Sequence, residues 1–321
     1  MKIITTCPLE WADTGVYWYL KNLEFVSNTK HIPWNQFQIQ DADLVISCGI
    51  GEVDLLKLKR QKVKVGVLFC SPLAQAHIVP SSPNGDLDSL LRYVNMLKSG
   101  DIDYVFLASK QLAELFKNDK IIYLPPPLHW EGFPITKIED RKGIGYFGTM
   151  DRHKNLATMF GAVKHSGIED PFIITGSEKI SMCSFFSHLF DMKNIFVYPR
   201  FSRPALFEIM SKVKLGIQIG FSESFSYTVW ESAMLGVPSI VSPSIWWYCD
   251  DPFLKSYCMV QNLDDPILIG EKIKNLYLLA SMNKDCDGSA IYVELCKVAK
   301  KVAIETMNKN NQMIQEIFEK L

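Results

Sequence analysis

Short apolar runs alternate with stretches of helical periodicity along most of this chain. In the first part, the apolar runs predict β-strands over Ile3–Thr6, Leu44–Cys48, Val63–Cys70, Tyr104–Ala108 and Ile121–Leu124. The stretches between them predict helices over Val16–Phe25, Leu87–Leu97 and Lys110–Phe116. Because this alternation is typical of βα units, we expect an α/β fold with a parallel sheet.

A proline-bearing, charged stretch without periodicity follows this first part. It includes Pro125-Pro126-Pro127 and continues to Arg141, a composition typical of a linker. A second alternation begins at Gly143, and the end of the chain is rich in helical patterns. We therefore predict an N-terminal domain over 1–128, a linker over 129–142, a second domain over 143–288 and a C-terminal helical segment over 289–321.

One segment of the second domain carries the strongest functional signal. Glu223 and Glu231 are eight residues apart, and the pattern from Ser226 to Leu235 predicts a helix that ends before Gly236. The N-terminus of such a helix presents unpaired N–H groups to an anion such as a diphosphate. At about 1.5 Å per residue, the two carboxylates would lie roughly 12 Å apart along the axis. This separation suits a nucleotide-sugar.

The same segment resembles the E-x7-E motif of GT-B glycosyltransferases, especially those of the retaining family 4. Order and spacing agree over about 140–280. Ile144–Met150 looks like the strand and phosphate loop that open the family's donor domain, Phe172–Gly176 like its second strand, and Asn194–Phe201 like its base-contacting strand and loop. The resemblance implies a GT-B fold, in which two Rossmann-like domains face each other across a cleft and the C-terminal helix crosses back to the first domain.

The resemblance also implies roles for residues of the second domain. Glu231 would accept hydrogen bonds from the ribose hydroxyls of the donor. Glu223 would contact the donor sugar and stabilise positive charge at its anomeric carbon, with covalent nucleophile as the alternative role. Lys154 would offset the charge of the leaving diphosphate. The further donor-binding candidates are Gly148, Thr149, Arg152, Tyr198, Arg200, Ser224, Phe225, Ser226 and Tyr227.

The chain departs from the family pattern at the donor site. The family usually has Gly where this chain has Ser224 and Ser226, so the usual donor sugar is not assumed. It also usually has an Arg at the place of Thr149, for which Arg152 is the candidate substitute. Trp246-Trp247-Tyr248 stands where the family commonly has small residues, and could stack on a sugar or base or pack between the domains.

In the first domain, two candidates are weaker matches to the family. Gly15 follows Thr14 before a predicted helix and resembles the Gly-rich acceptor-side loop, with a plain helix-cap turn as the alternative. The family often has a cleft histidine directly after a strand, whereas His77 follows the strand that ends at Cys70 by several residues. His77 is therefore a shifted catalytic candidate, with an ordinary loop histidine as the alternative.

Composition limits the classes of partner and location. The 321 residues carry a net charge of −1, so the molecule as a whole has no general attraction to nucleic acid or anionic membranes. No apolar run reaches the 18 or so residues of a membrane span, and the N-terminus reads as a strand rather than a signal peptide. The eight cysteines lack C-x-x-C spacing, which indicates free thiols in a reducing cytosol.

Two charged features leave alternatives open. The basic run Lys57–Lys64 is typical of a solvated face, but would also suit peripheral contact with the inner face of the membrane or with a phosphate backbone. Three Asp-x-Asp triplets resemble the metal motif of the other glycosyltransferase fold. Two of them precede strands, whereas ligand sites of α/β folds lie at the carboxyl ends, so we predict no metal site.

The leading prediction is a cytoplasmic, metal-independent, retaining glycosyltransferase without a cofactor. It would move a sugar from a UDP- or GDP-linked donor to a hydroxyl of a glycan or a lipid-linked saccharide. In the family, the leaving diphosphate oxygen is thought to take the acceptor proton, so no dedicated base is needed. The alternatives are a phage-type DNA-base glucosyltransferase and a catalytically idle sugar-nucleotide-binding subunit.

Overall fold

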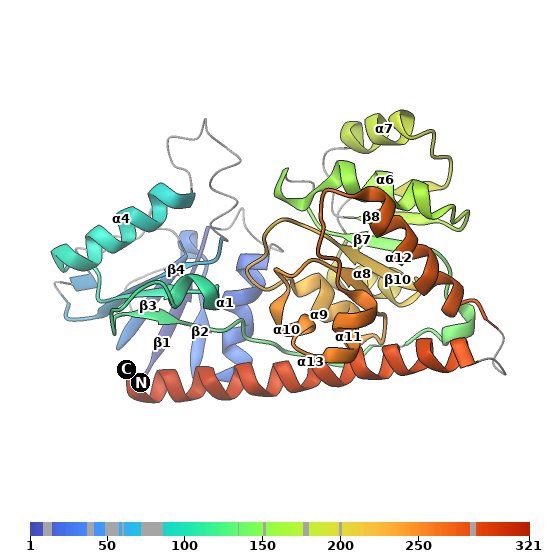
Figure 1. Ribbon diagram of the computed structural model, residues 1–321. Helices are drawn as coiled ribbons and strands as arrows, with labels where there is room; N and C mark the ends of the chain where they lie inside the picture. The colour runs from blue at the N-terminus through green and yellow to red at the C-terminus, as the bar shows by residue number, and fades with distance from the viewer. Residues whose placement is uncertain are drawn as a thin grey trace. The chain divides into compact units, whose positions relative to one another are not determined.

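The computed structural model describes residues 1–8, 15–36, 42–48, 58–59, 61–71, 86–133, 135–149, 152–175, 180–198, 201–282 and 287–321. The chain divides into two compact units. Unit 1 comprises residues 1–130 and 307–321, and unit 2 comprises residues 131–306. Each unit is built on a parallel β-sheet (Figure 1).

The sheet of unit 1 has six parallel strands in the order β2-β1-β3-β4-β5-β6. The strands are β1 (Ile3–Thr6), β2 (Thr29–His31), β3 (Leu44–Cys48), β4 (Lys64–Phe69), β5 (Tyr104–Leu107) and β6 (Ile121–Tyr123). The helices are α1 (Gly15–Val26), η2 (Trp34–Gln36), α4 (Asp86–Ser99) and α5 (Lys110–Ala113). The predicted strands are confirmed to within one residue at each end, whereas β2, a three-residue strand, was not predicted.

The burial of the strands explains why they appear in the sequence as continuous apolar runs. Val45 of β3 lies in register with Val65 of β4, and Val67 lies in register with Val105 of β5. All four valines are at most 1% exposed. Parallel strands are covered on both faces, so they read as continuous apolar runs rich in β-branched residues.

The sheet of unit 2 has five parallel strands in the order β11-β10-β7-β8-β9. The strands are β7 (Ile144–Phe147), β8 (Phe172–Thr175), β9 (Ile195–Val197), β10 (Leu215–Gln218) and β11 (Ser239–Val241). The helices are η3 (Ile138–Asp140), η4 (Arg152–Lys154), α6 (Leu156–Ser166), α7 (Ile180–Leu189), α8 (Arg203–Ser211), α9 (Tyr227–Met234), α10 (Trp246–Cys249), α11 (Pro252–Cys258) and α12 (Pro266–Leu279). The helix predicted over 226–235 is therefore confirmed as α9.

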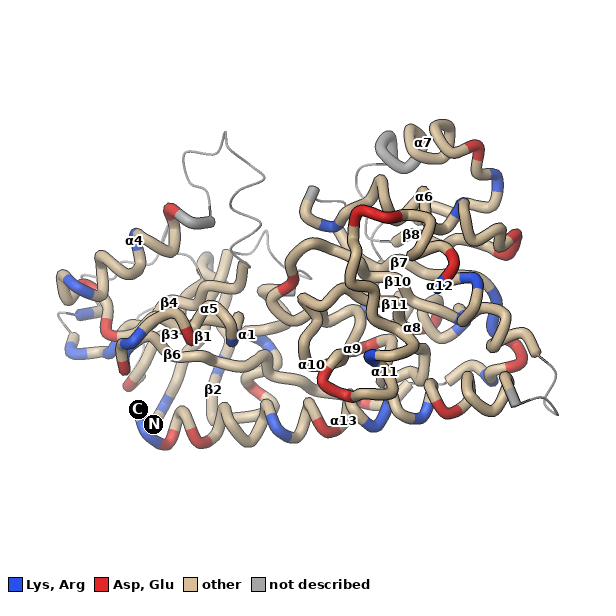
Figure 2. The backbone as a smooth tube through the Cα atoms, in the orientation of Figure 1, with Lys and Arg blue, Asp and Glu red and all other residues tan. Residues whose placement is uncertain are grey.

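The last helix, α13 (Asp287–Lys320), contributes to both units. In unit 2, the indole Nε1 of Trp230 donates to the carbonyl of Ala303 at 3.0 Å. In unit 1, Asn310 Nδ2 donates to the carbonyl of Pro126 at 3.1 Å, and Asn311 donates to the carbonyl of Leu128 at 2.8 Å. Both acidic and basic residues occur along α13 (Figure 2). This helix confirms the predicted return of the C-terminal segment to the first domain.

No described helix is both long enough and apolar enough to cross a membrane.

Candidate functional site

Strand order places the candidate site at the carboxyl edge of the unit 2 sheet. The chain runs outward from β7 through β8 to β9 and then returns to β10 on the other side of β7. The switch point of a doubly wound sheet lies between two such strands, and ligands bind at their carboxyl ends. Lys154 follows β7 in η4, and Glu223 follows β10 in the loop before α9. The topology therefore brings two of the predicted residues together.

Glu223 is held by two donors from different elements. Its Oε1 lies 2.5 Å from Lys154 Nζ and accepts from Gln218 Nε2 at 2.6 Å. The side chains of Lys154 and Glu223 are only 12% and 9% exposed. Gly220 permits the close packing of this loop, because a Cβ there would lie 3.1 Å from the carbonyl oxygen of His153. The arrangement pairs a nearly buried cation with a nearly buried anion.

Glu231 lies on α9 and is 6% exposed. Arg203, in the first turn of α8, donates to Glu231 Oε1 from both Nε and Nη2, at 3.1 and 2.8 Å. Burial raises the pKa of the Glu231 carboxyl, and the charge of Arg203 and its hydrogen bonds act in the opposite direction. Both carboxylates of the predicted pair thus have a cationic partner.

Ser226 occupies a backbone conformation that favours glycine. It precedes α9 with φ = 68°, in the left-handed region, and its side chain makes no capping hydrogen bond in the described structure. Glycine adopts this conformation without steric cost, so a Gly at this position would fit the same backbone. The first N–H groups of α9 are therefore not satisfied by this side chain, and they suit an anionic group.

Two residues of the aromatic triplet after β11, Trp247 and Tyr248, are buried and support the loop, whereas Trp246 is partly exposed. Trp247 Nε1 donates to the carbonyl of Phe225 at 2.8 Å, and the two rings stack with centroids 5.3 Å apart. Both side chains are at most 3% exposed, and Tyr248 is fully buried. The ring of Phe225 consequently packs inside unit 2, whereas its neighbours Ser224 and Tyr227 are partly exposed.

The remaining predicted residues are spread over both units. Gly148 and Thr149 follow β7, and the carbonyl of Thr149 accepts from Tyr146. Tyr198 follows β9, is 37% exposed and has its ring centroid 5.6 Å from that of Phe201. In unit 1, Gly15 is the first residue of α1. His77, Arg200 and the side chain of Arg152 lie outside the described part of the chain.

Gln218 and Arg203 were not predicted as site residues. Gln218 interrupts an otherwise apolar strand and is 3% exposed, and a buried amide requires hydrogen-bond partners. That interruption is a signal that sequence inspection could have used. Arg203 gives no such signal, because its partner Glu231 is 28 residues away.

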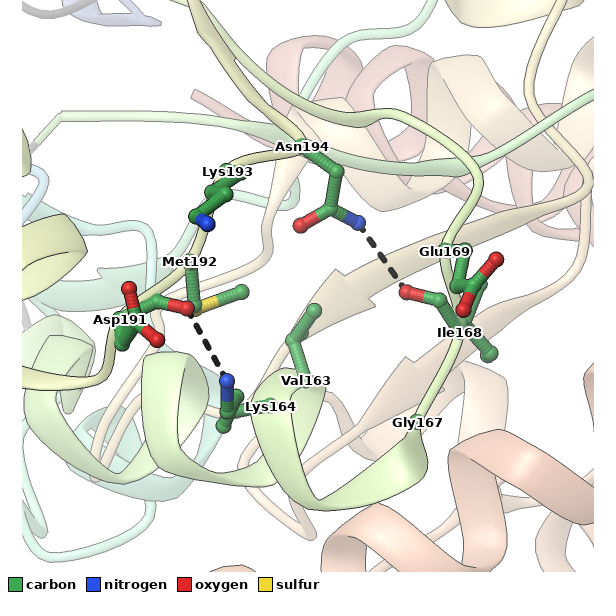
Figure 3. Close-up of a pocket in the computed structure, with 9 residues that line it drawn as sticks. All are labelled: Val163, Lys164, Gly167, Ile168, Glu169, Asp191, Met192, Lys193 and Asn194. Atoms are coloured by element: carbon green, nitrogen blue, oxygen red, sulfur yellow. Dashed lines mark hydrogen bonds between the residues drawn. The ribbon is translucent and has the colours of Figure 1, made fainter.

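A separate hollow of about 600 Å³ lies at the amino edge of the same sheet (Figure 3). Its lining residues precede β8 and β9, so it lies at the opposite edge from Glu223. Lys164 Nζ donates to the carbonyl of Asp191 at 3.0 Å, and Asn194 Nδ2 donates to the carbonyl of Ile168 at 3.0 Å. These polar groups hold the surrounding turns together, and we do not assign a ligand to the hollow.

Three charged residues of unit 1 have structural partners. Within the basic run, Lys59 Nζ lies 2.6 Å from Asp103, and Lys64 Nζ donates to the carbonyl of Leu321 at 2.6 Å. Asp43 accepts from the backbone of Lys2. Among the residues that the structure describes, no three His, Cys, Asp or Glu side chains gather in a way that could hold a metal ion.

Comparison with known proteins identifies the fold. No family model and no curated protein sequence matches the chain. Among solved structures, it is similar to HepE from Anabaena in complex with UDP and glucose, with a TM-score of 0.70, 10% identity and full coverage of both chains. It is similar to sucrose-phosphate synthase from Thermosynechococcus elongatus, with a TM-score of 0.67, 11% identity and coverage of 100% and 99%.

A third similar structure is a mutant of TarM from S. aureus, bound to UDP, fondaparinux and α-GlcNAc-glycerol. Its TM-score is 0.65 at 11% identity, and the match covers 86% of this chain. The matched region spans about half of the TarM chain, at 54%. These similarities show that the chain has the GT-B fold, as the sequence motifs predicted.

Proposed function

We propose that this GT-B chain is a glycosyltransferase that transfers a hexose from a nucleotide-sugar to a hydroxyl group. The observation that carries the proposal is the pair of nearly buried carboxylates on either side of the α9 N-terminus. Glu223 and Glu231 each have a cationic partner, at the switch point where α/β sheets bind ligands. The solved structures with this fold that contain UDP support a nucleotide-linked donor.

The geometry suggests how the donor would be held. The ribose hydroxyls would donate to the Glu231 carboxylate, and the diphosphate would accept hydrogen bonds from the α9 N-terminus and from Lys154. Lys154 now bonds to Glu223, so donor binding would share its charge between the carboxylate and the phosphate. Glu223 would then contact the sugar and stabilise positive charge that develops at the anomeric carbon.

The proposed reaction keeps the configuration of the anomeric carbon and uses no metal ion. The acceptor oxygen bonds to the anomeric carbon as the bond from that carbon to the phosphate oxygen breaks. The acceptor proton passes to the leaving phosphate oxygen, so the products are the glycosylated acceptor and a nucleoside diphosphate. Retention rests on the family resemblance of the E-x7-E segment.

We propose UDP or GDP as the nucleotide and a glycan or lipid-linked saccharide as the acceptor, in the cytoplasm or at the inner face of the membrane. Support for UDP comes from the ligands of HepE and TarM. The α-GlcNAc-glycerol bound to TarM is a glycosylated hydroxyl compound, in keeping with transfer to a hydroxyl.

Thermal unfolding with separate additions of UDP, GDP and their hexose conjugates tests the donor site. A ligand at about 100 times its Kd stabilises the folded state by about 2.7 kcal/mol, which raises Tm by several degrees. We expect one nucleotide to raise Tm in the wild type and not in Glu231→Ala. Glu208→Ala is the matched control, because the Glu208 side chain is 69% exposed on α8.

Release of the nucleoside diphosphate from the conjugate then tests turnover. Nucleotide binding without any release or transfer, over a panel of saccharide acceptors, would favour the idle-subunit alternative. No shift with any nucleotide at millimolar concentration would overturn the proposed function itself.

A further inference from the structure

Arg203 contacts Glu231 in a way that the E-x7-E motif does not imply. Two N–H groups of the same guanidinium converge on one carboxylate oxygen, Oε1, at 3.1 and 2.8 Å. The second oxygen, Oε2, accepts no hydrogen bond from the residues that the structure describes. One oxygen is thus engaged by the protein and the other remains for a ligand.

A buried carboxylate needs such a partner to stay ionised. Moving a charge out of water is costly, and a buried acid without a counter-charge takes up a proton instead. A protonated carboxyl is a weaker acceptor for a diol than a carboxylate with all of its lone pairs. Arginine suits the task because its guanidinium keeps its charge at every relevant pH.

The guanidinium of Arg203 is itself supported by the surrounding structure. Its Cζ lies 5.3 Å from the ring centroid of Phe207, one turn later in α8. Phe207 is 2% exposed and packs edge-to-face against Phe133, with ring centroids 4.5 Å apart. Pro204 lies in the first turn of α8 and favours helix formation from this point. Arg203 is therefore held in place before any ligand binds.

Other charged groups do not replace Arg203 beside Glu231. The strands β10 and β11, which pack against α9, carry no ionisable side chain. The acid of α8, Glu208, is exposed and bonds to Lys212. On α13, near the residue that accepts from Trp230, Lys301 and Glu305 are exposed and lie 3.9 Å from each other. Within the described residues, Arg203 is the charge that acts on Glu231.

We propose that Arg203 is a positioning residue of the nucleotide site, which keeps Glu231 ionised and its Oε1 engaged so that Oε2 is left for the ribose hydroxyls. This inference rests on the proposed function, because it assigns Glu231 to the nucleotide. It goes further by naming a residue outside the motif on which ribose binding depends.

Binding of UDP and of GDP, each measured by calorimetry from pH 5 to pH 8, tests the proposal. In Arg203→Met, we expect affinity at neutral pH to fall at least tenfold. We also expect the pH below which affinity is lost to rise by about 1–3 units, the usual effect of an adjacent opposite charge on a carboxyl pKa. Arg203→Lys should keep the wild-type pH profile with weaker binding, because it retains the charge without the fork of two N–H groups.

Three controls separate positioning from a structural role. Glu231→Gln and the double variant Arg203→Met/Glu231→Gln lack the titrating group, so their pH profiles should coincide and show only the titration of the nucleotide phosphate. Arg92→Met removes an equal charge from an exposed site in unit 1 and should bind like the wild type. Circular dichroism and Tm at each pH confirm that each variant is folded. If Arg203→Met does not fold, the comparison with the wild type uses Arg203→Lys instead.

The possible failures are distinguishable. If the wild type binds UDP or GDP and Glu231→Gln weakens that binding, but Arg203→Met keeps both the affinity and the pH profile, the role of Arg203 is overturned and the proposed function stands. A uniform loss of affinity in Arg203→Met, with an unchanged pH profile, also overturns it. If the wild type binds neither nucleotide, the proposed function fails, and the inference fails with it.

Discussion

At the scale of single residues, the buried amide of Gln218 decides how Glu223 is held. Its Nε2 donates to the same carboxylate oxygen that Lys154 contacts, whereas its own Oε1 is buried without a hydrogen-bond partner among the described residues. The opposite orientation of the amide would place two oxygen atoms together, so the hydrogen bond determines the orientation. The contact therefore leaves one buried acceptor unsatisfied.

Replacing Gln218 by Leu is expected to lower kcat/KM about tenfold with little change in stability. The substitution removes a charge-assisted hydrogen bond to Glu223, worth about 1.5–3 kcal/mol, but also removes the unsatisfied acceptor. Sugar transfer and urea unfolding measure the two effects, with Gln111→Leu, an exposed change in unit 1, as the control. Lost stability with unchanged kcat/KM would contradict this view.

His31 in unit 1 is a buried histidine held neutral. Its Nδ1 lies 3.0 Å from Thr5 Oγ1, and its Nε2 lies 3.8 Å from Cys7 Sγ. Burial lowers the pKa of His31 to about 4, while the nearby charge of Glu24 opposes the shift. The folded state therefore resists protonation of this ring at pH values where the unfolded chain accepts it.

Unit 1 is expected to lose stability as the pH falls from about 6.5 towards 4. Because the folded pKa of His31 lies below its unfolded value, its contribution to the free energy of unfolding is fully present above pH 6.5 and is lost towards pH 4, with a total of about 3 kcal/mol. His31→Gln should remove this part of the pH dependence of unfolding by urea. His188→Gln, at an exposed position in unit 2, should leave it intact. Equal slopes in His31→Gln and the wild type would refute the assignment.

At the scale of elements, Arg141 caps the C-terminus of α9, the helix that carries Glu231. Its Nη1 donates to the carbonyl of Gly236 at 2.5 Å and its Nη2 to that of Leu235 at 3.1 Å, just beyond the end of α9. Its Nε donates to the carbonyl of Thr136 at 3.2 Å. A cation at this end satisfies exposed helix carbonyls and complements the helix dipole. The guanidinium thus ties α9 to the segment that precedes β7.

Arg141→Met is expected to destabilise unit 2 by about 3 kcal/mol, because Arg141 is only 2% exposed and its loss leaves buried carbonyls without donors. Arg141→Lys should recover part of the loss, since an ammonium cannot reproduce the planar fork. Urea unfolding measures the change, and Lys142→Met, an exposed neighbour, is the control. A change below about 0.5 kcal/mol would show that water replaces the guanidinium.

At the scale of the whole molecule, the charge balance bears on the DNA-modifying alternative. The chain has 34 basic and 35 acidic residues, and Figure 2 shows both signs along α13. In the basic run, Lys59 bonds to Asp103 and Lys64 to the end of the chain. Each phosphate contact by a free cation adds to a steep salt dependence of DNA binding. Two of the cations of the run, Lys59 and Lys64, are instead engaged within unit 1.

Duplex DNA is therefore expected to bind with a Kd no tighter than about 100 µM at physiological salt, the weak end of non-specific binding. Fluorescence anisotropy of a labelled duplex from about 50 to 200 mM salt measures this. Lys62→Glu, an exposed change within the basic run, should alter the signal little. Micromolar binding that weakens steeply with salt would instead support transfer to a DNA base.

The sequence by itself determined the strands, the two alternating βα regions and the carboxylate pair of α9. Strands buried on both faces require continuous apolar runs, so their positions are local properties of the chain. Strand β2 (Thr29–His31) was not predicted, because three residues are too few to form a recognisable pattern. Glu223 and Lys154 were predicted by their place in a motif, and the topology then brought them together.

Only the tertiary structure decided which groups surround the two carboxylates, Glu223 and Glu231. Arg203 and Glu231 are 28 residues apart, Lys154 and Glu223 are 69 apart, and Arg141 and Gly236 are 95 apart. No local periodicity connects such positions, because their contact depends on the strand order and on the packing of α8 and α9. The motif therefore specified the acids, and the three-dimensional fold specified the donors that hold them.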